Sequence, residues 1–194
     1  MWVREALLVR RPDDVRMDVL SPFGLALAVG TDGTLLWAYP AGEGTRYEGP
    51  ATPANIARFL GTSGSVRDLV DILLGLPPAR TPTAPAELHV AGGTYELVVP
   101  FAEGVERSRF AGDTLELAGA EETRADGDAL RVAFSDYRDG FPHAIEVASS
   151  GRNAHATLVY DAVELNPALD ATLFAPPPAG RVLPLDAASA PARR

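Results

Sequence analysis

Short segments of alternating apolar and polar residues run through most of this chain, and turn dipeptides separate them. In residues 14–19, valine and methionine alternate with arginine and aspartate, which is typical of a strand with one buried face. Residues 23–29 and 34–39 flank Asp32-Gly33, a dipeptide that favours a tight hairpin. Further strands are predicted at 87–90, 94–100, 114–118, 121–125, 130–137, 144–148 and 154–163. The pattern predicts a mainly β (α+β) fold whose antiparallel sheet follows the chain order and curls.

Two helices are predicted between these strands. The first, 53–60, has Thr52 as its N-cap, and the second, 65–75, begins with a capping box formed by Ser65 and Asp68. Apolar residues cover about 200° of the second helix, roughly twice the stripe that a surface helix needs. We therefore expect this helix to contact apolar material on two sides and to lie across the open mouth of the curved sheet.

The length of 194 residues fits a single domain, which we expect to span residues 1–185. Residues 186–194 have nothing to bury, so we expect a disordered tail there. No apolar run approaches the roughly 18 residues of a membrane-spanning helix. The formal charge of -9 argues against binding to nucleic acid or to an anionic membrane face. The first residues do not read as a secretory signal, so we expect the targeting segment to be missing from this sequence or to have been removed.

Residue types that carry catalysis or bind metals are scarce. The chain has no cysteine and no lysine, which excludes thiolate chemistry and Schiff-base formation. His89, His143 and His155 have no partner at the spacing of familiar metal motifs, and we interpret them as polar positions on strands. Residues 61–65 form a Ser/Gly cluster, but it joins two helices, whereas a nucleophile elbow joins a strand to a helix. We interpret this cluster as helix capping.

Acidic residues cluster at Glu121, Glu122, Asp126 and Asp128. Paired carboxylates carry out acid–base chemistry only in a cleft that perturbs their ionisation. These four residues flank a predicted hairpin turn, which favours a solvated edge. We therefore predict a protein that is not an enzyme, with no catalytic residue, no metal and no cofactor.

Apolar strand positions leave two interpretations of the interior open. Leu25, Leu27 and Val29 fall on one side of their strand, and the next strand groups Leu35 with Trp37. Such alternation fits either a filled barrel core or the lining of a cavity. The large apolar surface of the second predicted helix favours the cavity.

A single aromatic residue, Phe23, lies between Pro22 and Gly24 at the expected connection between two strands. A large aromatic side chain at a hairpin tip is costly to leave in water and often signals contact with an apolar partner. The alternative is that Phe23 folds back onto the sheet.

Several short stretches between residues 15 and 78 occur in a distinctive order. They are an Arg-x-x-x-Leu strand at 16–20, Ser21-Pro22-Phe23-Gly24, the Asp32-Gly33 hairpin, Thr45-Arg46-Tyr47, and Leu73-Leu74-Gly75-Leu76-Pro77. With this order and spacing the chain resembles LolB, the outer-membrane lipoprotein that receives lipoproteins from the periplasmic carrier LolA and inserts them into the membrane. Later stretches at 141–142, 164–167 and 173–177 are similar to the C-terminal end of LolA-type carriers.

The resemblance implies an incomplete antiparallel β-barrel around a hydrophobic cavity, with a two-helix lid and with lipoprotein acyl chains inside. It implies that the loop Pro22, Phe23 and Gly24 inserts into the membrane, although the family carries an aliphatic residue where this chain has Phe23. The family's lipidated cysteine, first helix and first strand have no counterpart before Trp2. The residues expected to line the lipid-binding cavity are Leu27, Val29, Leu35, Trp37, Ile56, Phe59, Leu60, Leu69, Leu73, Leu97, Val132 and Phe134.

The expected function is therefore non-catalytic binding of lipoprotein acyl chains and their transfer into the outer membrane. The expected partners are acylated lipoproteins or lipids, a periplasmic LolA-type carrier and the outer-membrane surface. The expected location is the cell envelope, at the periplasmic face of the outer membrane, with no anchor in this chain. The alternative is a structural or regulatory envelope module that uses the same fold to bind a protein partner.

Overall fold

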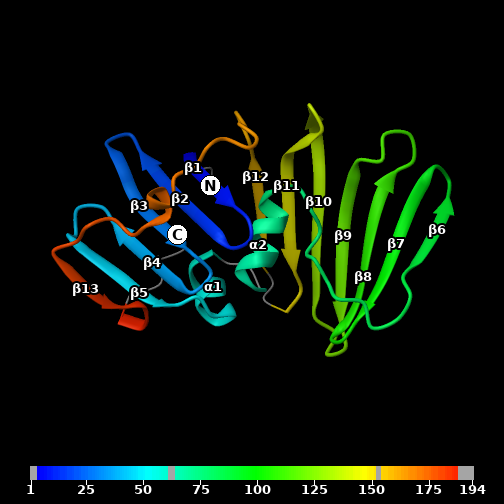
Figure 1. Cartoon of the computed structure of the whole chain (residues 1–194), viewed down its shortest axis with the longest axis horizontal. Helices are drawn as coiled ribbons and strands as arrows, with labels where there is room; N and C mark the ends of the chain where they lie inside the picture. Colours follow the sequence, from blue (N-terminus) through cyan, green and yellow to red (C-terminus); the bar gives the residue numbers. More distant parts are fainter. Residues whose placement is uncertain (1–3, 61–63, 152–153, 188–194) are drawn as a thin grey trace. The chain divides into compact units, whose positions relative to one another are not determined.

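The computed structural model describes residues 4–60, 64–151 and 154–187, which fall into two compact units. The first unit contains the chain up to Val70 and again from Asn166, and the second contains Asp71 to Leu165. Each unit is built on its own β-sheet (Figure 1). The chain passes from the first unit to the second within a helix.

Six strands form the sheet of the first unit. They are β1 (Arg4–Arg10), β2 (Asp14–Ser21), β3 (Gly24–Thr31), β4 (Leu35–Pro40), β5 (Thr45–Pro50) and β13 (Arg181–Pro184). The first five strands are antiparallel neighbours in chain order, as short connections allow. In contrast, β13 pairs with β5 in parallel, so the C-terminal part of the chain completes a sheet that the N-terminal part begins (Figure 1).

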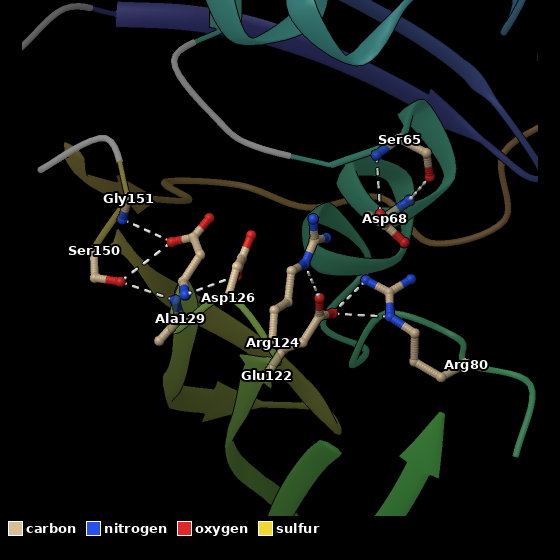
Figure 2. Close-up of polar contacts among 10 residues, drawn as sticks. Ser65, Asp68, Arg80, Glu122, Arg124, Asp126, Ala129, Ser150 and Gly151 are labelled. Atoms are coloured by element: carbon tan, nitrogen blue, oxygen red, sulfur yellow. Dashed lines mark hydrogen bonds and ion pairs between the residues drawn. The ribbon is translucent and has the colours of Figure 1, made fainter. Parts of the chain in front are cut away.

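Two helices follow β5, and both begin at the predicted caps. Helix α1 is Pro53–Leu60, and the Thr52 hydroxyl accepts the backbone N–H three residues further on at 3.3 Å. Helix α2 is Val66–Leu73. The backbone N–H of Ser65 donates to the Asp68 carboxylate at 2.9 Å, and the Ser65 hydroxyl accepts the Asp68 N–H at 3.2 Å (Figure 2). This reciprocal pair is the capping box predicted from the sequence.

Helix α2 ends in a Schellman motif at Gly75. The backbone N–H of Leu76 donates to the carbonyl of Asp71 at 2.9 Å, and the N–H of Gly75 donates to that of Ile72 at 3.0 Å. Gly75 has φ of 75°, a conformation in which a side chain is strained. A Cβ at this position would also lie 2.7 Å from Pro142. Glycine is therefore required here by both the backbone and the space.

Seven strands form the sheet of the second unit, and each is antiparallel to the next in chain order. They are β6 (Glu87–Ala91), β7 (Thr94–Phe101), β8 (Gly104–Ala111), β9 (Leu117–Arg124), β10 (Ala129–Arg138), β11 (Phe141–Ser149) and β12 (Ala154–Val159). One face of this sheet, which we call its inner face, carries the apolar core. The buried residues of that core are Ile72, Leu117, Leu130, Val132, Phe134, Ile145 and Val147.

The predicted fold class is confirmed, because strands dominate the described residues, two helices accompany them and neither sheet closes into a barrel. Some strand predictions were wrong. The separate strands expected at 114–118 and 121–125 are one strand, β9, and the strand expected at 154–163 ends at Val159. Four strands, β1, β5, β8 and β13, were not predicted at all. In β8 the alternation fails because polar residues occupy its buried positions.

Single-domain folding of 1–185 stays a prediction. Of the tail expected at 186–194, Asp186 and Ala187 belong to a short 3-10 helix, η2 (Leu185–Ala187), in which Leu185 is buried. Residues 188–194 lie outside the described residues.

Candidate functional site

The turn between β2 and β3 presents Phe23 to solvent. The side chain is 99% exposed, which excludes the alternative that it folds back onto the sheet. Leu20 and Leu25 at the ends of the two strands are also exposed, so the tip has three apolar side chains. The Ser21 hydroxyl accepts the Phe23 N–H at 3.2 Å and donates to the carbonyl of Gly24 at 3.0 Å. Short-range hydrogen bonds therefore shape this turn, although its aromatic side chain is not covered by any other described residue.

Residues that face each other across antiparallel strands point to the same face of a sheet. In the first sheet Val29 is opposite Ala38, whereas Trp37 is opposite Gly30. Leu27 and Val29 therefore lie on one face, and Leu35 and Trp37 lie on the other. The expectation that these four residues line one cavity was wrong, because the register of β3 and β4 separates them.

The face that carries Trp37 is covered by residues 169–177, which we call the C-terminal strap. Trp37 is 1% exposed, and its indole N–H donates to the carbonyl of Phe174 at 3.3 Å. A Cβ on Gly30 would lie 2.3 Å from the Trp37 ring, so this strand position accepts only glycine. Trp37 is thus a packed core residue beneath the strap.

Three arginines fix the strap at carbonyls spaced four residues apart. Arg10 donates to Leu169, Arg16 to Leu173 and Arg46 to Pro177. Each arginine also has a nearby carboxylate partner on its own or the neighbouring strand: Asp14, Asp18 and Glu48. The strap therefore covers this polar face of the first sheet in part, and the three arginines keep side-chain exposures of 38%, 22% and 16%.

The other predicted cavity residues of the first unit have mixed environments. Ile56 on α1 is fully buried, and Leu69 on α2 is half-buried. The side chains of Phe59 and Leu60 lie outside the described residues. Leu73, at the end of α2 in the second unit, is 7% exposed, and its carbonyl accepts the Tyr160 hydroxyl at 3.1 Å.

The inner face of the second sheet has a closed part and an open part. Val132 and Phe134 are each 4% exposed and pack in the core with Ile72 of α2. Leu97 shares their face, because it is opposite Ser108, and the row continues through Ala120 to Val132. Leu97 itself is only half-buried.

Beside Leu97 the inner face carries further accessible apolar residues. Leu88 is opposite Leu97, and Val90 is opposite Tyr95. Leu88 is 60% exposed and Val90 is 65% exposed. We call Leu88, Val90, Tyr95 and Leu97 the open strip, on β6 and β7 at one edge of the sheet (Figure 1). The sequence predicted both strands but did not single out Leu88 and Val90, although their alternation with charged and polar neighbours was a usable signal.

A buried ionic cluster lies on the same inner face, and sequence reasoning missed it. Glu122 is 3% exposed and accepts hydrogen bonds from Arg80 at 2.8 Å and from Arg124 at 2.7 Å (Figure 2). The hydrogen bond to Glu122 raises the pKa of Arg124. The interpretation of Glu122 as part of a solvated edge was wrong, because β9 turns this side chain inward. Its neighbour Glu121 points to the opposite face.

The remaining candidates for chemistry have structural roles. The Asp128 carboxylate accepts the Gly151 backbone N–H at 2.7 Å and the Ser150 hydroxyl at 3.2 Å, which ties two turns together. His143 is buried with Nδ1 2.9 Å from the carbonyl of Tyr160. In the Ser/Gly cluster at 61–65, Ser65 caps α2, and residues 61–63 lie outside the described part. Within residues 4–60, 64–151 and 154–187, no group of three or more metal-binding side chains could hold an ion.

Within the same ranges, no helix is both long enough and apolar enough to cross a membrane. No protein-family model matches the chain, and no curated protein sequence matches it.

Solved structures show similarity in fold. A LolA superfamily protein from Nitrosomonas europaea aligns with a TM-score of 0.56 at 10% identity, covering 90% of this chain and 81% of that protein. An outer membrane lipoprotein-sorting protein domain from Vibrio parahaemolyticus aligns with a TM-score of 0.54 at 11% identity, covering 89% of this chain and 80% of that domain. The fold of this chain is therefore similar to that of LolA-superfamily proteins.

Proposed function

We propose that this chain is a non-catalytic, LolB-like acceptor that binds the acyl chains of lipoproteins or related lipids and delivers them into the outer membrane. Its partners would be acylated cargo, a LolA-type carrier in the periplasm and the periplasmic face of the outer membrane. The observation that carries the proposal is the fully exposed Phe23 on a hydrogen-bonded turn, because nothing else in the described chain shields this aromatic ring.

Phe23 provides a membrane contact of suitable strength. Burial of a phenylalanine side chain contributes about 1.5–3 kcal/mol. That free energy corresponds to roughly a 10- to 200-fold gain in affinity, which supports a reversible contact and is far below that of a stable anchor. A reversible contact suits a protein that releases its cargo repeatedly.

The open strip supports the binding half of the proposal. Leu88 and Val90 expose apolar surface that a lipid chain would cover, and Leu97 continues this surface toward the core. Each buried methylene contributes about 0.8 kcal/mol, so an acceptor that covers two more methylenes than its donor gains about tenfold in affinity. Transfer from carrier to acceptor then needs no energy source. On the first sheet, the predicted cavity residue Leu27 is half-buried and could contribute to this role, whereas Val29 on the same face is only 2% exposed and already covered by the protein.

A delivery assay tests the role of Phe23. The Phe23→Glu variant should bind an acylated lipoprotein as the wild type does but should insert it poorly into liposomes. Phe23→Leu should keep delivery, because it keeps an apolar tip. Leu115→Glu is the matched control, since Leu115 is also an exposed apolar residue in a turn, at 63% exposure. Normal delivery by Phe23→Glu would remove the loop from the mechanism.

A binding assay tests the open strip. Val90→Glu should reduce the binding of a fluorescent fatty-acid probe, whereas His89→Glu, on the other face of the same strand, should not. Undiminished probe binding in Val90→Glu would overturn the role of the strip. A wild-type chain that binds no acyl probe but forms a stable complex with an envelope protein would favour the module alternative.

A further inference from the structure

The outer face of the second sheet, opposite the core, contains a shallow hollow of about 330 Å³. It lies where β8 and β9 shift register at a β-bulge, an irregularity that is common beside binding sites. Its floor is made of small residues, which are Ala118, Gly119, Ala133 and Ala148. A Cβ on Gly119 would lie 2.6 Å from the Val132 carbonyl oxygen, so the close pairing of β9 with β10 requires the glycine that lowers the floor.

Charged side chains surround this floor, and the register of the strands determines their positions. Arg109 is opposite Gly119, which is opposite Ala133, which is opposite Glu146. Arg109 on β8 and Glu146 on β11 are therefore three strand spacings apart, about 14 Å between backbones. Both are long side chains that line the hollow between them. A cation and an anion thus lie at opposite sides of one small depression.

The next row of paired residues adds a second arginine, Arg107, on the same strand as Arg109. Arg107 on β8 is opposite Glu121, which is opposite Arg131. Arg131 pairs with Glu121 at 3.1 Å, and Arg109 pairs with Glu96 at 2.9 Å.

Three lining residues have no such partner. Within the described part of the chain, the side chains of Arg107, Glu146 and His155 have no hydrogen bond or ion pair with another residue. One guanidinium and one carboxylate at the hollow therefore have their hydrogen-bonding capacity available to a ligand.

We propose that this hollow binds a small zwitterion with a phosphate and a primary ammonium group a few atoms apart, either free or as the ethanolamine headgroup of a phospholipid. The planar fork of Arg107, supported by Arg109, matches the several acceptor oxygens of a phosphate. The Glu146 carboxylate accepts the N–H groups of the ammonium. The site is on the face opposite the open strip, so it does not depend on acyl-chain binding.

An NMR titration of the full chain with O-phosphoethanolamine tests the proposal. The amide signals of Gly119 and Ala133 should shift and saturate, with a dissociation constant on the order of 1 mM. Arg107→Gln and Glu146→Gln should each weaken binding about tenfold, because each removes one charge-assisted contact. The matched controls are Arg138→Gln and Glu87→Gln, which remove the same charges elsewhere on the sheet and should bind normally. These four side chains are solvent-accessible, so all the variants should keep the wild-type circular dichroism spectrum and unfolding midpoint.

Two simpler probes test whether the hollow needs both charges of the zwitterion or binds an anion or a cation alone. Inorganic phosphate alone and ethanolamine alone should each bind less tightly than O-phosphoethanolamine, because each engages one side of the hollow. The proposal is overturned if phosphate alone binds as tightly, if the shifts do not saturate, or if the two site variants bind like the controls.

Vesicles identify the source of the zwitterion. Binding to vesicles that contain phosphatidylethanolamine, absent with phosphatidylcholine alone and lost in Glu146→Gln, would assign the headgroup. Saturable binding of the soluble compound without such vesicle binding would assign a free small molecule. Either result is independent of the delivery assay, since Phe23→Glu should leave this titration unchanged.

Discussion

Removal of the Glu122 carboxylate tests how the second sheet tolerates charge on its apolar face. Glu122 is 3% exposed, and its partner Arg80 has a side chain only 15% exposed that stacks 5.5 Å from the Phe101 ring. Glu122→Ala leaves this guanidinium buried without that carboxylate, and breaking a buried pair costs about 3–5 kcal/mol. The second partner, Arg124, is 38% exposed and can return to water, so it adds little. We expect a loss of about 3 kcal/mol in the free energy of unfolding.

Urea unfolding followed by far-ultraviolet circular dichroism measures this loss. With a slope of about 1–3 kcal/mol per molar urea, the unfolding midpoint should fall by roughly 1–3 M. Glu121→Ala is the matched control, because this neighbour pairs with Arg131 on the opposite, accessible face. It should change the free energy of unfolding by less than about 0.5 kcal/mol. Equal effects of the two substitutions would refute the argument that burial sets the cost.

Three further predictions concern the first unit. Gly30→Ala should lower the free energy of unfolding by at least about 1–3 kcal/mol in urea titrations, because the new methyl group overlaps the buried Trp37 ring; an unchanged midpoint would contradict this packing. Ser65→Ala should cost about 1 kcal/mol and lower the melting temperature by a few degrees, since one half of the capping box is lost, and a melt identical to wild type would refute that role. The backbone N–H of Thr172 holds the pKa of Asp170 below its ordinary value of 3.8, so the folded state is stabilised above that value and loses this contribution as pH falls through the folded pKa. Asp170→Asn should therefore flatten the pH dependence of thermal unfolding between about pH 5 and pH 2, and an unaltered dependence would show that other carboxylates dominate.

Local signals in the sequence predicted the elements that depend on local interactions. The capping box at Ser65 and Asp68 and the hairpin at Asp32-Gly33 form within a few residues, and both are present. The sequence left open whether Phe23 is exposed, and the structure decides it: Phe23 lies in the turn between the end of β2 at Ser21 and the start of β3 at Gly24.

Tertiary contacts decided the features that the sequence did not predict. Strand β8 has Glu106 and Ser108 at buried positions, so its alternation does not resemble that of an amphipathic strand. Leu115, with φ of 60°, belongs to a turn although its neighbours alternate like a strand. The hydrophobic pattern of β4 likewise could not show that Trp37 lies under a distant strap, because both faces of that strand are buried.

The parallel pairing of β13 with β5 has a consequence for synthesis of the chain. A ribosome releases β1 to β5 first, yet the strand that completes their sheet emerges only after all seven strands of the second unit. Until then the unpaired edge of β5 can associate with other chains, and the ring of Trp37 lacks its cover. A truncation before residue 169 should therefore produce aggregation rather than a shorter soluble protein, although it removes neither sheet's antiparallel strands.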